Sequence, residues 1–171
     1  MLNKEIAAKI TDQINYELFS AYLYLDISNY YADNNLNGFA NWFKIQAQEE
    51  RDHAMLFMDY MLNNGEKIQL KDIKAPNKTY SDFREPTVAA FEHELKVTER
   101  IHEIYGLAHE QKDYRTMQFL NWFVQEQNEE EKNAEENIKK YDLFGTDAKG
   151  LYLLDSELAA RVYKFPPSLT L

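Results

Sequence analysis

Carboxylate and imidazole side chains recur at helical spacing in four separate segments of the chain. Glu50 and His53 lie three residues apart, so a helix would place an oxygen and a nitrogen ligand on one face. Each of the other three segments carries one carboxylate on its apolar stripe: Glu17, Glu94 and Glu130. Carboxylates from several helices together with a Glu-x-x-His pair are the pattern of di-iron and di-manganese bundles. One imidazole among several carboxylates suits iron or manganese better than zinc or copper.

Four long helices must hold these side chains, and the apolar periodicity predicts them. In each helix apolar residues recur at alternating spacings of three and four. Gly65 and Gly145 follow the second and fourth helices in the position of a C-terminal cap, and Pro86 suits the start of the third. The predicted bounds are about 3–33, 36–64, 87–111 and 114–144.

The connections between the helices predict their arrangement. The first and second helices are joined by a few residues, as are the third and fourth, so each pair should form an antiparallel hairpin. Residues 65–86 show no helical period and can stretch to roughly 70 Å, whereas a helix of this kind is about 43 Å long. Residues 147–161 predict a short fifth helix. The expected fold is all-α, a four-helix bundle with one long crossover and a short C-terminal helix.

The positions of the carboxylates along each hairpin indicate that they meet at one depth. The midpoint between Glu17 and Glu50 falls at the break between the first two helices. The midpoint between Glu94 and Glu130 falls at the break between the last two. Unpaired carboxylates are costly in an apolar interior. The stripes offer no Lys or Arg at this depth, and protonation of so many groups at neutral pH is expected to be unfavourable, so bound cations are the economical solution.

Composition and charge restrict the class of protein. The 171 residues have the length of a single domain, expected to span 1–171. A net charge of −10 would repel nucleic acid and anionic lipid. The absence of cysteine excludes disulfides, zinc–thiolate sites and thiol catalysis. Because no signal-peptide segment or membrane-length apolar run is present, we expect a cytoplasmic protein with no nucleic-acid and no membrane partner.

Two sequence motifs carry a resemblance to a known family. The segments FKIQAQEERDHA and FLNWFVQEQNEEEK contain Glu50-x-x-His53 and Gln127-x-x-Glu130. Together with residues on the first and third helices, they resemble the ferroxidase centre of the bacterial non-haem ferritins. The resemblance extends from Lys4 to about the end of the fifth helix and includes the crossover. The residues that complete the match are Glu17, Tyr24 and Glu94.

The resemblance implies a role for each of these side chains. Glu17 and His53 would hold a first iron, and Glu50 would bridge to a second. Glu94 and Glu130 would hold that second iron. The remaining two side chains would lie beside the metals, as a neighbouring amide and as a phenol that hydrogen-bonds the site: Gln127 and Tyr24.

In the same family a third iron position is formed by four carboxylates. This sequence has all of them, namely Glu49, Glu126 and Glu129 with the shared Glu130. Helical geometry places them beside the bundle centre toward one surface, where they could pass iron outward. Haem is not expected, because Asp52 stands before His53 where a haem-binding bacterioferritin would carry a Met beside the site, and a second Glu-x-x-His motif is missing.

The resemblance implies a ferroxidase that stores iron. Two Fe(II) ions would be oxidised by O2 or H2O2, and ferric mineral would collect in a hollow homo-oligomer of 24 subunits. A di-iron oxidase or detoxifying ferritin-like protein without a storage shell is the alternative. A DNA-protecting mini-ferritin would instead build its site between subunits. A purely structural bundle would have apolar residues at 17, 50, 94 and 130.

Overall fold

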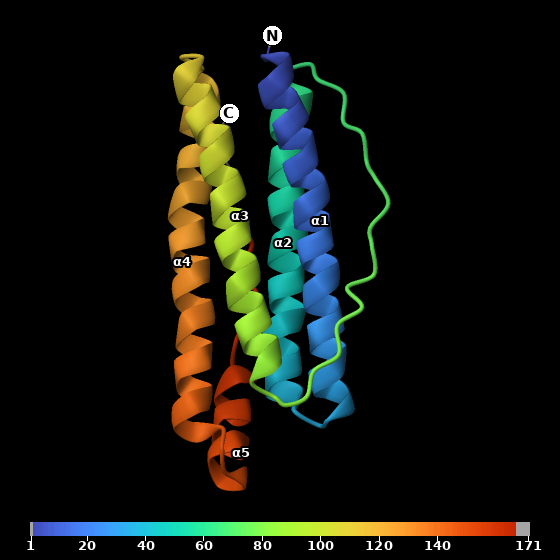
Figure 1. Ribbon diagram of the computed structural model, residues 1–171, viewed down its shortest axis with the longest axis vertical. Coiled ribbons are helices and arrows are strands. Elements are labelled where there is room, and N and C mark those ends of the chain that lie inside the picture. Colours follow the sequence, from blue (N-terminus) through green and yellow to red (C-terminus); the bar gives the residue numbers. More distant parts are fainter. Residues whose placement is uncertain (1, 167–171) are drawn as a thin grey trace.

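The computed structural model describes residues 2–166, and in this range the chain folds into a bundle of long helices (Figure 1). Adjacent helices α1 and α2 form one antiparallel hairpin, and α3 and α4 form the other. The all-α four-helix bundle with a short fifth helix is confirmed. The helices are α1 (Lys4–Asp33), α2 (Asn37–Asn63), α3 (Glu85–Glu110), α4 (Tyr114–Phe144) and α5 (Ala148–Leu158).

The long connection between α2 and α3 runs beside α1 along the whole bundle, so that α2 and α3 are parallel (Figure 1). Helix α1 holds this connection by side-chain contacts to its backbone. Asn15 donates to the carbonyl of Gln69 and accepts from the backbone nitrogen of Lys71, at 3.0 and 2.7 Å. Near the other end, the Tyr31 hydroxyl donates to the carbonyl of Phe83 at 2.7 Å. The crossover is therefore tied to the bundle at both ends.

Each hairpin turns through one residue in the left-handed region of backbone conformation. These residues are Asn35, with φ of 59°, and Lys112, with φ of 56°. Asp113 follows as the N-cap of α4 and accepts from the backbone nitrogen of Thr116 at 3.1 Å. Gly65, with φ of 75°, ends α2 as the sequence predicts. The tight turns fix the register of each hairpin and thus the depth at which its side chains meet.

Helix α5 ends at Leu158, three residues before the expected end at 161. Beyond it the backbone turns away from the helix, and the amide of Asn41 donates to the carbonyl of Arg161 at 3.1 Å. The Arg161 guanidinium reaches the carbonyl of Trp42 at 3.0 Å. These contacts with α2 replace the next helical turn, and they place Arg161 beside the centre of the bundle.

The apolar core consists of two blocks with a polar layer between them. One block includes Ile10, Phe57 and Ile101 toward the N-terminal end of α1, and the other includes Tyr31 and Phe43 toward its C-terminal end. The polar layer lies at mid-bundle. Among residues 2–166, no helix is both long and apolar enough to cross a membrane.

Candidate metal centre

The polar layer at mid-bundle contains four glutamates and one histidine that are almost completely shielded from solvent. All five are at most 4% exposed, and they come from four helices. The hairpin geometry thus brings the sequence-predicted side chains to one depth. They are Glu17 on α1, Glu50 and His53 on α2, Glu94 on α3 and Glu130 on α4.

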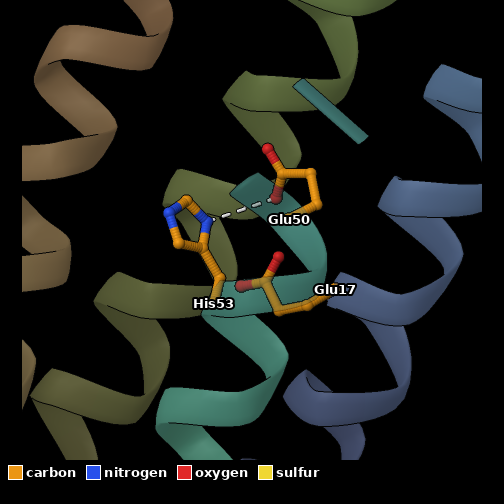
Figure 2. Close-up of side chains that lie close together, drawn as sticks. All are labelled: Glu17, Glu50 and His53. Atoms are coloured by element: carbon orange, nitrogen blue, oxygen red, sulfur yellow. Dashed lines mark ion pairs between the residues drawn. The ribbon is translucent and has the colours of Figure 1, made fainter. Parts of the chain in front are cut away.

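These side chains form two groups, each able to hold one metal ion, and the two groups share a residue. In the first, ligand atoms of Glu17, Glu50 and His53 all lie within 4.8 Å of one another, and the side chains point toward one another (Figure 2). In the second, Glu50, Glu94 and Glu130 meet the same limit. Because Glu50 belongs to both groups, it is placed to bridge two ions.

Two carboxylate oxygens in the first group accept no hydrogen bond from residues 2–166. They are Oε2 of Glu17 and Oε2 of Glu50. His53 Nδ1 lies 3.3 Å from Glu50 Oε2 without hydrogen-bond geometry. Adjacent ligands of an octahedral ion with bonds of about 2.1 Å are about 3.0 Å apart. His53 Nδ1 and Glu50 Oε2 therefore have the separation of two ligands of one ion. The two free carboxylate oxygens also fit a bound metal.

Five of the other carboxylate oxygens at the centre accept hydrogen bonds from neutral side chains. Tyr24, which is 1% exposed, donates from its hydroxyl to Glu94 Oε1. Gln127 Nε2 donates to Glu94 Oε2 at 3.1 Å. Burial, followed by repulsion from Glu94, raises the pKa of the Tyr24 phenol well above 10. The phenol therefore keeps its proton at neutral pH. It can donate the hydrogen bond to the site that the family resemblance implies.

Burial is the main cause of a pKa of about 8 for each of the four central glutamates. Repulsion between the glutamates is the second cause. The charge of Glu50, for example, raises the pKa of Glu17 and of Glu94. The carboxyl groups therefore retain protons at neutral pH when no cation is bound, contrary to the expectation that protonation there is unfavourable. A metal ion would replace these protons, because metal ligands bind as carboxylates.

The residues expected at a third iron position are only partly brought together. Glu126 forms a group of possible ligands with His53 and Glu130. Glu126 and Glu129 both line a pocket of about 510 Å³, which opens beside the central site. Glu49 also lines this pocket, but its carboxylate forms an ion pair with Arg161, and both side chains are 19% exposed.

The comparisons with known proteins agree with this architecture. The sequence profile of the ferritin-like domain matches residues 7–144. The chain belongs to the ferritin family. It is 40% identical over 163 residues to the bacterial non-heme ferritin of Staphylococcus epidermidis RP62A, and 38% identical to that of Staphylococcus haemolyticus. Each alignment covers 95% of this chain and 98% of the relative.

Solved ferritin structures have the same fold. An engineered closed form of Archaeoglobus fulgidus ferritin has a TM-score of 0.93 and 37% identity, and the match covers 96% of this chain and 100% of the other. A humanized archaeal ferritin has a TM-score of 0.94 and 39% identity, with coverage of 96% and 99%. This protein is thus a ferritin by family and by fold.

Several side chains that contact the ferritin centre were not expected as site residues from the sequence. Gln13 and Gln46 lie on the inward stripes, four residues before Glu17 and Glu50, and that spacing is the signal that could have found them. The sequence offers no signal for Arg161, which lies 115 residues from its partner Gln46.

His93 is buried, yet it does not belong to the metal-binding groups found among residues 2–166. Its Nε2 lies 2.7 Å from the Ser20 hydroxyl, and its ring stacks on Tyr16. Burial, aided by nearby lysine and arginine charges, lowers its pKa to about 3, so the ring is neutral at physiological pH.

Proposed function

We propose that this ferritin is a ferroxidase that binds two Fe(II) ions between its helices. Glu17, Glu50 and His53 bind the first ion, and Glu50, Glu94 and Glu130 bind the second. The observation that carries the proposal is the sharing of buried Glu50 by two groups of possible ligands, with a free oxygen on Glu50 and another on Glu17. A shared ligand keeps two ions close enough to react with one oxidant molecule.

The reaction removes one electron from each Fe(II). O2 takes two electrons and two protons to become H2O2, or H2O2 takes the same number to become two water molecules. The ligands hold the ions in place while the apolar blocks on either side exclude bulk water. Tyr24 and Gln127 keep the Glu94 carboxylate oriented through their hydrogen bonds. A second Glu-x-x-His pair would hold the second iron more tightly than Gln127 and Glu130, so this iron is the one released.

Ferric iron then leaves toward a store of mineral. Glu126 and Glu129 line the pocket beside His53 and Glu130 and provide the third iron position on this route. The mineral collects inside a shell of 24 subunits, as the family resemblance implies. A di-iron oxidase without a shell remains the alternative function, and it would use the same centre.

Purified protein given Fe(II) in air is expected to form ferric iron faster than buffer alone, because the centre brings two ions to one oxidant. The measurement is the initial rise in ferric absorbance, combined with light scattering on the same sample. We expect a particle of 24 subunits of 20.3 kDa each. An oxidation rate equal to that of buffer would reject ferroxidase activity, whereas rapid oxidation by a stable dimer would favour the oxidase without a shell.

A further inference from the structure

Two buried glutamines stand one helical turn before two of the proposed iron ligands, and each contacts an arginine. Gln13 precedes Glu17 on α1, and Gln46 precedes Glu50 on α2. Their exposed fractions are 0% and 1%. The side-chain oxygen of Gln13 accepts from Nε of Arg100 at 2.8 Å. The side-chain oxygen of Gln46 accepts from Nη1 of Arg161 at 2.9 Å.

The arginine in each pair determines which end of the amide faces the iron site. A guanidinium has only hydrogen-bond donors, so the end of the glutamine that it contacts must be the oxygen. The opposite end is therefore the NH2 group, and it donates toward the centre. Gln13 Nε2 reaches Glu17 Oε1 at 2.8 Å, and Gln46 Nε2 reaches Glu50 Oε1 at 3.1 Å.

Each glutamine contacts only one of the two oxygens of its glutamate, so the other oxygen stays available to iron. Oε1 of Glu17 and Oε1 of Glu50 are held by the glutamines, and the two Oε2 atoms are the buried oxygens that accept no hydrogen bond from the described residues. These two side chains point toward each other and toward His53 in Figure 2. Gln46 also donates to Glu130 Oε2 at 2.7 Å, so it connects ligands from both halves of the bundle.

Aromatic rings hold both arginines in place. The Arg100 guanidinium lies 4.3 Å from the centroid of the Tyr16 ring, and the Arg161 guanidinium lies 4.2 Å from that of Trp42. Arg161 also pairs with Glu49. Arg100 comes from α3 and Arg161 follows α5, so each glutamine is fixed by a segment outside its own hairpin.

We propose that Arg100 and Arg161 are positioning residues of the iron centre, acting through Gln13 and Gln46. Each arginine fixes the orientation of one buried amide, and the amide fixes one carboxylate oxygen so that the other is presented to iron. Without the arginine, the amide is free to turn its oxygen toward the carboxylate, where two acceptors repel each other. The inference rests on the proposed function, because it assumes that Glu17 and Glu50 are ligands.

Anaerobic titration with Co(II) tests this proposal without relying on oxidation. The visible absorption of bound Co(II) reports both its affinity and its coordination. Arg100→Met and Arg161→Met are each expected to weaken Co(II) binding by about 10–100-fold, the usual effect of removing an outer partner of a metal ligand. Arg100→Lys is expected to restore part of the affinity, because lysine also only donates. Arg115→Met, at an arginine that contacts Asn64 instead, is the matched control and should bind as wild type.

A double-mutant cycle separates positioning from a general structural effect. Arg100 and Gln13 are the better pair for it, because Arg161 also contacts Glu49. Once Gln13→Leu has removed the amide, Arg100→Met should cause no further loss of Co(II) affinity and no further change in the spectrum. Equal losses in both backgrounds would overturn the proposal. So would wild-type affinity and spectrum in Arg100→Met and Arg161→Met. Failure of the wild-type protein itself to bind Co(II) would instead reject the iron centre.

Discussion

Replacement of Glu50 by alanine is expected to slow Fe(II) oxidation by more than about 100-fold, because loss of even an outer partner of a metal ligand costs about 10–100-fold. Two of the possible ligand groups found among residues 2–166 lie at the centre, one with Glu17 and one with Glu94. Glu50 is the one residue that belongs to both. Its removal therefore weakens both iron positions and takes away the group that holds the two ions together. The measurement is the initial rate of ferric absorbance at saturating oxygen.

The matched control for this variant is Glu103→Ala. Glu103 is an exposed glutamate on α3 that pairs with Lys9 at 2.8 Å on the surface. It should oxidise iron at the wild-type rate. Glu17→Ala and His53→Ala should also be severely slowed, because each removes a ligand of the first ion. Wild-type kinetics in Glu50→Ala, Glu17→Ala and His53→Ala would show that oxidation takes place elsewhere.

The metal-free protein is expected to become less stable as the pH rises from 7 to 9. Burial raises the pKa of the four central glutamates from 4.5 to about 8 in the folded chain. A carboxyl group with a raised folded pKa contributes stability that is fully present below pH 4.5 and is lost as the pH rises through 8. The loss arises because the folded chain must then bury negative charges that the unfolded chain exposes to water.

The expected loss of stability can be calculated for one of the four central glutamates. Between pH 7 and 9, a group with a pKa near 8 lowers the free energy of unfolding by about 1.4 kcal/mol. For a chain of this length that corresponds to a fall in Tm of about 3–5 °C. With four such groups in one layer, calorimetry of the metal-free protein should show a fall of at least about 5 °C.

The buried His93 and Tyr31 titrate outside this window. Burial lowers the pKa of His93 to about 3, and it raises the pKa of Tyr31 well above 10. Glu94→Gln removes one titrating carboxyl at nearly constant size and should make the fall in Tm smaller. An equal or higher Tm at pH 9 in the wild-type protein would contradict the presence of a buried carboxylate layer.

The depth of the centre could be predicted from the sequence because a tight hairpin fixes the register of its two helices. The midpoints between Glu17 and Glu50, and between Glu94 and Glu130, fall at turns that contain only a few residues. The structure accordingly brings all four carboxylates and His53 to one layer. Their roles as iron ligands remain predictions that the proposed variants test.

The contacts made by the chain beyond α5 could not be predicted in the same way. The spacing of apolar residues predicts a fifth helix over 147–161, which would carry Arg161 in its last turn. The bonds that end the helix early come from Asn41 and Trp42 on α2, and no local pattern encodes such distant partners. For the same reason the ion pair between Arg161 and Glu49 was not expected, although Glu49 itself was.

The orientation of the glutamine amides was equally beyond prediction. Gln13 and Gln46 occupy inward positions in the sequence, but which end of each amide faces the carboxylate depends on an arginine from another part of the fold. The sequence therefore predicts which groups meet at the centre, whereas the structure shows how their free oxygens are presented.

Anomalous diffraction at the iron edge tests the central claim most directly. Crystals of metal-free protein would be soaked anaerobically in Fe(II) before data collection. The account predicts two peaks inside the bundle of each subunit, one among Glu17, Glu50 and His53 and the other among Glu50, Glu94 and Glu130. Iron peaks confined to the adjacent pocket of Glu126 and Glu129 or to exposed carboxylates, with none inside the bundle, would contradict it.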